Sequence, residues 1–214
     1  MKNESLEKFI DIYNSGVWLV PMSSYKISSD VEVAKVWDKF PTGKLCNEES
    51  YRFFFITNDI ECVAIVLDME GSDIHWFVAE KHRKQGYLYK ALKDSIFPYL
   101  FDDGRKEQRA TADNSENEAY LMRQGFKRRT EGVEVAYYLN ANDVSKYDKS
   151  QLCRISLSSD ELEAIKFELR RVSGEIRIIR DKLECANGED HGLNNIACDL
   201  CNFAHDVEFY FQKT

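Results

Sequence analysis

The sequence predicts an α/β domain followed by a helical hairpin, and three observations carry this prediction. Apolar and aromatic runs of strand length alternate with segments of helical spacing between about residues 17 and 140. The stretch His75–Leu92 has the character of a short strand, a charged turn with a glycine, and the start of a helix. From residue 158 onward, apolar residues recur at alternating spacings of three and four. We therefore divide the chain into residues 1–149 and 150–214.

The turn within His75–Leu92 has the features of an anion-binding site. Residues 76–78 are bulky or β-branched, as in a buried strand, and apolar residues return at helical spacing after Gly86. A helix start leaves N–H groups unpaired, and a glycine lets an anion approach the main chain without meeting a Cβ. Arg83 and Lys84 add two formal positive charges at the same place.

Two linked segments give this chain a resemblance to a known family. Residues 83–88, RKQGYL, resemble the R/Q-x-x-G-x-G/A signature of the GNAT superfamily of acyl-CoA-dependent N-acyltransferases. Residues 112–126, with Asn114 near the start and Gly-Phe at the end, resemble the next strand and helix of that family. The resemblance covers about residues 17–140. It implies a GNAT fold, in which helices flank a mixed, mostly antiparallel central sheet.

The resemblance also implies roles for particular residues, with acetyl-CoA as the co-substrate. The backbone of the strand at Phe77 and Val78 would pair with the pantetheine arm. The asparagine at Asn114 would contact the cofactor, although it could equally cap its helix. Leu88 departs from the usual Gly or Ala of the signature. The pyrophosphate would bind in the turn formed by Arg83, Lys84, Gln85, Gly86, Tyr87 and Leu88.

The implied reaction is direct attack of a neutral amine on the thioester, which needs a proton acceptor and an oxyanion donor. Asp73 and His75 share one face of the strand and are the candidate bases, with Glu70 just before them. His75 could also be a partly buried histidine of the strand without a catalytic role, and Asp73 could be a turn residue. Many family members have a tyrosine acid four residues before the closing Gly-Phe. Here that position is Leu121, as in the ribosomal-protein N-terminal acetyltransferase branch, and Tyr120 points about 100° away on a helix.

The patterns along the first part of the chain predict an alternation of strands and helices. The hydrophobic spacing begins with a short helix that ends at Asn14-Ser15-Gly16. A polar cap at Ser28-Ser29-Asp30 predicts a second helix that ends at Pro41-Thr42-Gly43. We expect helices at 6–13, 30–40, 86–100 and 114–124, and strands at 17–20, 51–57, 62–67, 76–78, 109–113 and 133–139.

Composition excludes several classes of function. A net charge of −8 over 214 residues argues against general nucleic-acid binding, which needs a basic surface. No apolar run approaches the roughly 18 residues of a membrane span, and residues 1–16 lack a signal-peptide apolar region. We therefore expect a cytoplasmic protein that acts on an amine, without nucleic-acid or membrane partners. The acceptor pocket lies in loops outside the motifs, so a small molecule and a peptide N-terminus both remain open.

Cysteine usage predicts reduced thiols and no metal. The six cysteines are scattered through a chain with no secretory signal, which favours free thiols over a disulfide framework. Cys198, Cys201 and His205 share one face of a predicted helix at spacings of three and four. A Cys-x-x-Cys within a continuous helix usually lacks the turn that lets both thiolates bind one zinc ion, so we expect these residues to pack against the first domain.

The last part of the chain has the pattern of two helices with heptad seams. A cap at Ser158-Ser159-Asp160 begins the first helix, and a loop at 187–190 separates the two. Each seam needs a partner, and Phe167, Phe209 and Phe211 lie on its flanks. We expect the flanks to meet the first domain or, slightly favoured, a second copy in a homodimer. The alternative to an enzyme is a non-catalytic CoA-binding or degenerate module acting through this hairpin. The seam residues are Leu162, Ile165, Leu169, Val172, Ile176, Ile179 and Leu183, then Leu193, Ile196, Leu200, Phe203, Val207 and Tyr210.

Overall fold

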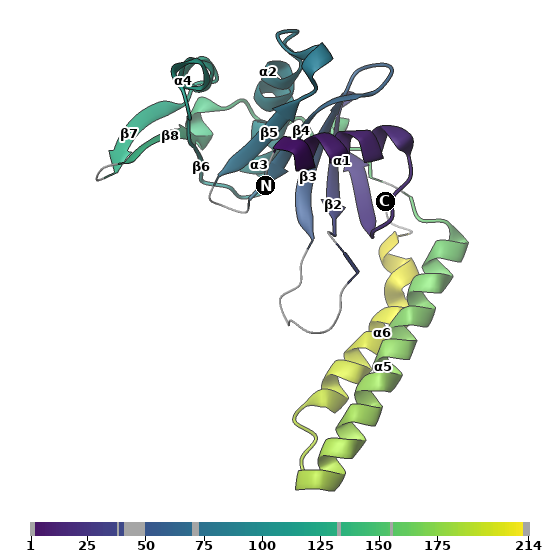
Figure 1. The fold of residues 1–214 in the computed structure, drawn as a ribbon. Helices are drawn as coiled ribbons and strands as arrows, with labels where there is room; N and C mark the ends of the chain where they lie inside the picture. Colours follow the sequence, from purple (N-terminus) through teal and green to yellow (C-terminus); the bar gives the residue numbers. More distant parts are fainter. Residues whose placement is uncertain are drawn as a thin grey trace. The chain divides into compact units, whose positions relative to one another are not determined.

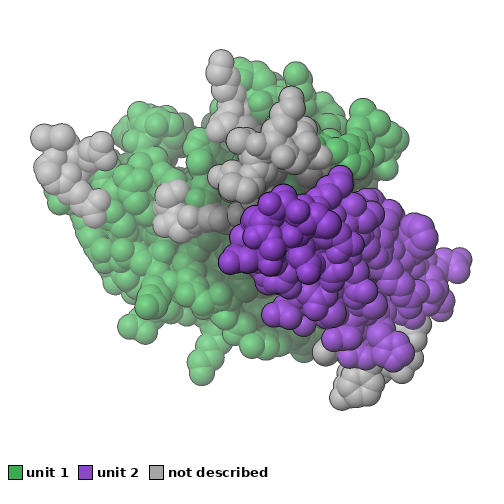
Figure 2. Space-filling view, turned by 90° about the horizontal axis from the view of Figure 1, so that it is seen from below, with its two compact units in different colours: residues 1–154 green, residues 155–214 purple. Residues whose placement is uncertain are grey.

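The structure is a computed structural model that describes residues 3–37, 39–40, 50–69, 73–131, 134–154 and 156–211. Its internal contacts divide the chain into two compact units, residues 1–154 and 155–214 (Figure 2). The sequence placed this boundary after residue 149. Each unit is described by itself below.

The first unit contains a five-stranded antiparallel sheet in the order β1-β2-β3-β4-β5 (Figure 1). All seven residues of β4 are buried, as expected for a central strand rich in Val, Ile and Leu. The strands are β1 (Met22–Lys26), β2 (Val31–Val36), β3 (Tyr51–Thr57), β4 (Cys62–Asp68) and β5 (Ile74–Val78).

A second, three-stranded antiparallel sheet has the order β6-β8-β7. Its strands are β6 (Glu107–Ala110), β7 (Lys127–Glu131) and β8 (Glu134–Asn140). Within the described residues β5 pairs only with β4, and β6 pairs only with β8. Each sheet therefore ends in a strand with one open edge, and Figure 1 shows β5 and β6 where the sheets part.

Side-chain contacts join the two sheets at the start of β5. The Thr111 hydroxyl, just after β6, donates to Asp73 Oδ2 at 3.0 Å, and Arg109 Nη1 lies 3.7 Å from the same oxygen. Asp68, fully buried at the end of β4, accepts from Arg105 Nη2 at 2.7 and 2.9 Å. A buried carboxylate requires such paired donors. These contacts hold β6 beside the start of β5, and the open edge of β5 continues toward Val78.

Helices cover both faces of the five-stranded sheet. The helix α1 (Asn3–Ser15) packs on one face with Phe53 and Phe55 of β3. The other face, with Phe54 and Ile56, packs against a continuous helical stretch made of α2 (Tyr87–Ala91), a π-helical turn (Leu92–Ile96) and α3 (Phe97–Asp102). The last helix of this unit, α4 (Ser115–Arg123), buries Leu121 in the same core. Alternating side chains of β3 thus supply both cores.

The mixed α/β prediction, with a mostly antiparallel sheet, flanking helices and a C-terminal helical hairpin, is confirmed. The N-terminal helix, the hairpin of β3 and β4, the strand before the turn and the helix after Gly86 all lie where the sequence placed them. The final strand also matches, as β8. The strand expected at 109–113 is observed as β6, at 107–110. The strand β7 was missed.

Two predictions near the N-terminus were wrong. Residues 17–20 do not form a strand, because Pro21 has no N–H to donate and the ladder with β2 begins at the next residue. The helix expected over 30–40 is instead the strand β2, whose Val31 and Val33 face one core while Val36 faces the other. The expected cap is a tight turn in which Ser28 Oγ donates to Asp30 Oδ1 at 2.8 Å. Residues 41–43 lie outside the described residues.

The second unit is a hairpin of α5 (Ser159–Asn187) and α6 (Leu193–Phe211), which lie side by side (Figure 1). Ser158 and Glu161 form a capping box at the start of α5, and Gly188 ends it at φ 79°. The predicted helices are confirmed. The predicted seam is partly covered. Its Val207 is buried and its Leu162, Leu169, Ile176, Leu193 and Leu200 are partly buried, whereas Ile165, Ile179, Leu183, Ile196 and Phe203 are exposed. Among the described residues, no helix is both long and apolar enough to span a lipid bilayer.

Candidate functional site

The turn after β5 is a preformed, left-handed corner. A single 3-10 turn at Glu80–His82 leads into Lys84 at φ 62° and Gly86 at φ 85°, and Gly86 is the N-cap of α2. The first helical hydrogen bond runs from Lys90 N–H to Gly86 O, at 3.0 Å. Within the described residues, no acceptor is paired with the N–H groups of Lys84, Gln85 and Gly86. Those of Tyr87 and Leu88 open the helix, so they have no intrahelical acceptor.

The space in front of Gly86 is open. A Cβ built on this glycine would meet no heavy atom within 4 Å, so neighbouring atoms would leave room for a side chain. The backbone conformation nevertheless favours glycine, because φ 85° is a conformation that L-residues adopt only at a cost. The exposed side chains of Arg83 and Lys84 flank this space with positive charge. The corner therefore has free amides, positive charge and room for an anion.

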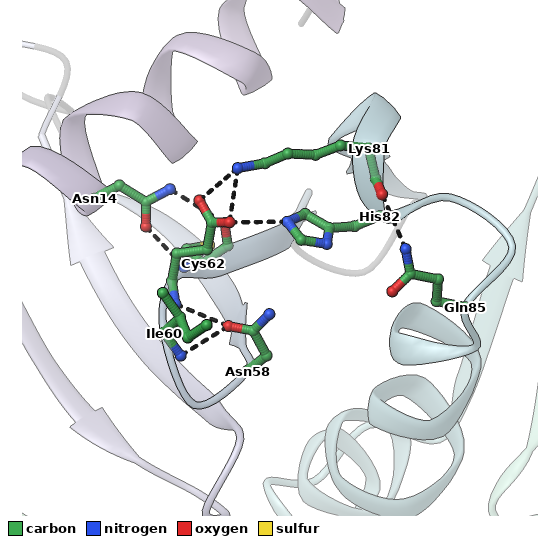
Figure 3. A network of polar contacts seen from close by, with 8 residues as sticks. Asn14, Asn58, Ile60, Cys62, Lys81, His82 and Gln85 are labelled. Atoms are coloured by element: carbon green, nitrogen blue, oxygen red, sulfur yellow. Dashed lines mark hydrogen bonds and ion pairs between the residues drawn. The ribbon is translucent and has the colours of Figure 1, made fainter.

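Glu61, in the turn between β3 and β4, anchors the corner through Lys81 and His82, whose side chains are labelled in Figure 3. Its carboxylate accepts from Lys81 Nζ at 2.7 and 2.8 Å and pairs with His82 Nε2 at 3.0 Å. The hydrogen bond from Lys81, and then that from His82, hold the pKa of the Glu61 carboxyl below its ordinary value. The 3-10 turn that precedes the corner is thereby fixed to the first sheet.

The amide side chains of Asn14, Asn58 and Gln85 extend this support (Figure 3). Asn58 Oδ1 accepts from the N–H groups of Ile60 and Glu61, at 2.9 and 2.8 Å. Asn14, at the end of α1, accepts from Cys62 N at 2.7 Å and donates to Cys62 O at 3.2 Å. Gln85 Nε2 donates to the Lys81 carbonyl at 2.9 Å. The network links α1, the β3–β4 turn and the corner, so the corner is held before any ligand arrives.

The strand β5 presents backbone groups next to the corner. Ala79 N donates to Val63 O at 3.0 Å, so the neighbouring pair Val78 and Ala64 is a non-hydrogen-bonded pair of the antiparallel ladder. The N–H and C=O of Val78 therefore point toward the open edge. Arg83 Nε donates to Val78 O at 3.2 Å, and its guanidinium lies 5.8 Å from the centre of the Phe77 ring. The Val78 N–H remains directed at the open edge.

Asn114 is the N-cap of α4. Its Oδ1 accepts from Asn117 N at 2.9 Å, which satisfies one of the free N–H groups of the helix start. The residue is exposed, and its Nδ2 group remains available as a donor. The capping role expected from the sequence is observed, and it leaves the amide nitrogen for a second role.

The position four residues before Gly-Phe belongs to the core. Leu121 is fully buried, while Tyr120 beside it contacts other aromatic rings, 5.9 Å from Trp76 and 6.5 Å from Tyr89. Burial raises the pKa of Tyr120 to about 12, and its hydroxyl accepts from Gln124 Nε2 at 3.3 Å. Sequence spacing predicted that these two neighbours point in different directions. It did not reveal the aromatic cluster, which joins three separate elements.

The candidate bases have different surroundings. His75 is exposed on β5, on the face opposite Trp76. Asp73 Oδ1 accepts from Ile74 N at 3.1 Å, and Oδ2 takes the contacts from Thr111 and Arg109 described above. Asp73 thus has a structural role at the junction of the two sheets, whereas His75 does not share it. Glu70 lies outside the described residues.

The cysteines give no further site. Cys62 is buried with its pKa raised to about 12 by burial, and the other described cysteines, at 153, 185, 198 and 201, are also free. Cys46 lies outside the described residues. Among the described residues, no three His, Cys, Asp or Glu side chains converge in a way that would hold a metal ion.

No family model matches this sequence, and no curated protein matches it either. Solved structures with a similar arrangement include an acetyltransferase from Salmonella typhimurium that modifies the N-terminal serine of ribosomal protein L7/L12, at 14% identity and a TM-score of 0.36. The match covers 42% of this chain and 63% of that one.

Two further structures, both with acetyl-CoA bound, have a similar arrangement. One is a GNAT family acetyltransferase from Elizabethkingia anophelis, at 14% identity and a TM-score of 0.33, with 42% of this chain and 76% of that one covered. The other is the N-acetyltransferase PseH from Campylobacter jejuni, at 12% identity and a TM-score of 0.34, covering 42% and 68%.

Proposed function

We propose that this chain is an N-acetyltransferase that transfers the acetyl group of acetyl-CoA to a primary amine by direct attack. The observation that carries the proposal is the joint geometry of the corner and the strand before it. A rigidly supported turn with unpaired amides and two cations directly follows a strand whose backbone is open where the two sheets part. A cofactor with a pyrophosphate and an amide-bearing arm matches both parts at once.

Each half of the cofactor has partners of suitable chemistry. The pyrophosphate accepts hydrogen bonds from the backbone N–H groups of residues 84–88, and the positive charges of Arg83 and Lys84 attract it further. The amides of the pantetheine arm pair with the open edge of β5 around Phe77 and Val78, in the manner of an added strand. The exposed amide nitrogen of Asn114 supplies a further donor. Of the remaining signature residues, Gln85 supports the turn by donating to the Lys81 carbonyl, and Tyr87 contributes its backbone N–H.

For the transfer step the protein must hold the amine close to the thioester and supply one proton acceptor. The amine must be neutral to attack, and we propose His75, or Asp73, as the group that removes its proton. The outward Val78 N–H is the donor for the oxyanion. A thiol of pKa near 8.5 leaves as the thiolate without an acid, so the buried Leu121 at the common acid position is compatible with catalysis.

The test is thiol release from acetyl-CoA across a panel of amines, including small polyamines, amino sugars and peptides with different first residues. We expect release above the uncatalysed rate with at least one amine, and a matched acetylated product by mass spectrometry. Release without any acetylated amine would point to hydrolysis and contradict the proposal.

The alternative is a CoA-binding module without catalysis that acts through its hairpin. The buried Leu121 at the position of the common tyrosine acid favours it. The two candidates differ in one measurement. A non-catalytic module binds CoA in calorimetry but releases no thiol with any amine of the panel, whereas an enzyme binds CoA and also releases thiol.

A further inference from the structure

The two helices of the hairpin approach each other through small and polar residues. Ser173 of α5 and Ala197 and Ala204 of α6 are buried, and Ser173 Oγ donates to Ala197 O at 2.7 Å. Arg180, seven residues after Ser173, donates to Asn194 Oδ1 at 2.9 Å. Small residues permit close approach of the helix backbones. Of the larger apolar side chains, Val207 is buried and Leu169, Ile176 and Leu200 are partly buried, while a second set lies on the flank of the contact.

On α5 the flanking residues form one row at heptad spacing. Ile165, Val172 and Ile179 are seven residues apart, and Leu183 follows at a spacing of four. Ile165 is 36% exposed, Ile179 53% and Leu183 37%. The row lies about 80° around the helix from the stripe that contains Ser173. Such a row is typical of a surface that packs against another helix.

On α6 a matching row lies on the same side of the hairpin. Ile196 is 50% exposed, and Phe203, seven residues later, is 46% exposed although it also makes a contact of its own. They are rotated from the contact stripe of Ala197 and Ala204 in the same sense as the row on α5. Because consecutive helices of a hairpin run antiparallel, equal rotations bring both rows to one side. The two rows thus form one continuous apolar surface, which we call the apolar face.

Acidic residues border this face on both helices. Glu161, Glu168 and Glu175 follow the outer edge of the α5 row at heptad spacing, with Lys182 as the next member of that line, and Asp199 and Asp206 follow the outer edge of the α6 row. Arg171 is shared between Glu168 and Glu175, so it neutralises only part of this charge. Residues 155–214 carry twelve Asp and Glu against seven Lys and Arg. The borders are therefore acidic overall.

We propose that the apolar face binds an amphipathic helix of another protein, with its apolar stripe bordered by Lys and Arg. The heptad spacing of both rows fits the side chains of a third helix lying along the hairpin. The acidic borders select basic residues at the edges of that helix. A second copy of this hairpin would place acidic borders against acidic borders, so self-association fits the charges less well.

The experiment uses the full chain and a synthetic 28-residue helical peptide. The peptide carries Ile and Leu at alternating spacings of three and four, with Lys at the bordering positions. A control peptide has the same apolar residues with Glu at those positions. By fluorescence anisotropy we expect the Lys peptide to bind at least tenfold more tightly than the Glu peptide, with affinity falling as salt screens the borders.

A pair of adjacent isoleucines supplies matched variants. Ile179 lies on the apolar face and Ile178 lies away from it, and they are 53% and 57% exposed. Ile179→Lys should lower the affinity for the Lys peptide at least tenfold, whereas Ile178→Lys should change this affinity less than twofold. Circular dichroism melting should find both variants folded, because both sites are half exposed.

Several results would overturn the proposal. They are no binding of the Lys peptide, equal binding of both peptides, or equal loss in the two isoleucine variants. Light scattering of the full chain could give a fourth contradicting result. A dimer that Ile179→Lys dissociates and Ile178→Lys leaves intact would assign the apolar face to a second copy of this chain.

Discussion

Replacing Gly86 by glutamate tests the proposed cofactor site most directly. At φ 85°, any L-residue costs the fold about 1–2 kcal/mol. A Cβ here meets nothing within 4 Å, so steric clash within the protein adds little. The new carboxylate would instead occupy the space that we assign to the pyrophosphate. We expect Gly86→Glu to fold with a lowered melting temperature and to lose acetyl-CoA binding.

The magnitude follows from charge and geometry. Two like charges about 4 Å apart repel by about 4 kcal/mol at the effective dielectric constant of a protein surface. A factor of ten in Kd corresponds to about 1.4 kcal/mol, so we expect affinity to fall by at least 100-fold. Isothermal titration calorimetry with acetyl-CoA measures the change. Gly86→Ala, which adds strain without charge, should lose much less affinity than Gly86→Glu.

Gly104 provides the matched control. It also has a left-handed backbone, at φ 101°, and a Cβ built on it likewise meets nothing within 4 Å. It lies beyond the far end of the helical stretch that begins at Tyr87, roughly 25 Å along the axis. Gly104→Glu should therefore share the loss of stability and retain acetyl-CoA binding. Unchanged affinity in Gly86→Glu, or an equal loss in Gly104→Glu, would refute the assigned site.

Three further variants test the support of the corner and the chemistry. In Glu61→Gln we expect weaker acetyl-CoA binding and a lower melting temperature at pH 7. The folded pKa of Glu61 is lowered, so its stabilisation should vanish as the pH falls below its ordinary pKa of 4.5, and a difference that persists in acid contradicts this. Tyr120→Phe should keep kcat within about threefold, because a fall of 100-fold or more would identify its phenol as an acid. His75→Ala should lower kcat more than 100-fold in thiol-release assays while calorimetry finds acetyl-CoA affinity unchanged, and an unaltered kcat would exclude His75 as the base.

The sequence by itself determined the features that depend on neighbours along the chain. The turn conformation follows from Gly86, the capping box from Ser158 and Glu161, and the cap of α4 from Asn114. Each is formed by residues at most four positions apart, so local rules describe it. The helices of the hairpin and the strands β3 and β4 were predictable for the same reason, because their periodicity is a local property.

Tertiary structure decided which of two locally permitted conformations formed and what supports the site. The segment at 31–36 has apolar residues compatible with a helix, yet it becomes a strand because β1 and β3 supply partners on both sides. The anchoring of Lys81 and His82 by Glu61 joins residues about twenty positions apart. No sequence spacing predicts such a contact.

The same distinction holds for the open edge of β5 and for the hairpin. Periodicity identified β5 as a strand, but only the separation of the two sheets leaves its outer edge open. Heptad spacing predicted an apolar seam, but with the close approach at Ser173 and Ala197 only part of that seam is covered, and Ile165, Ile179 and Ile196 stay exposed on the flank. A periodic pattern specifies which residues share a face. The partner that covers the face is chosen by long-range packing, to which side-chain size and distant hydrogen bonds contribute.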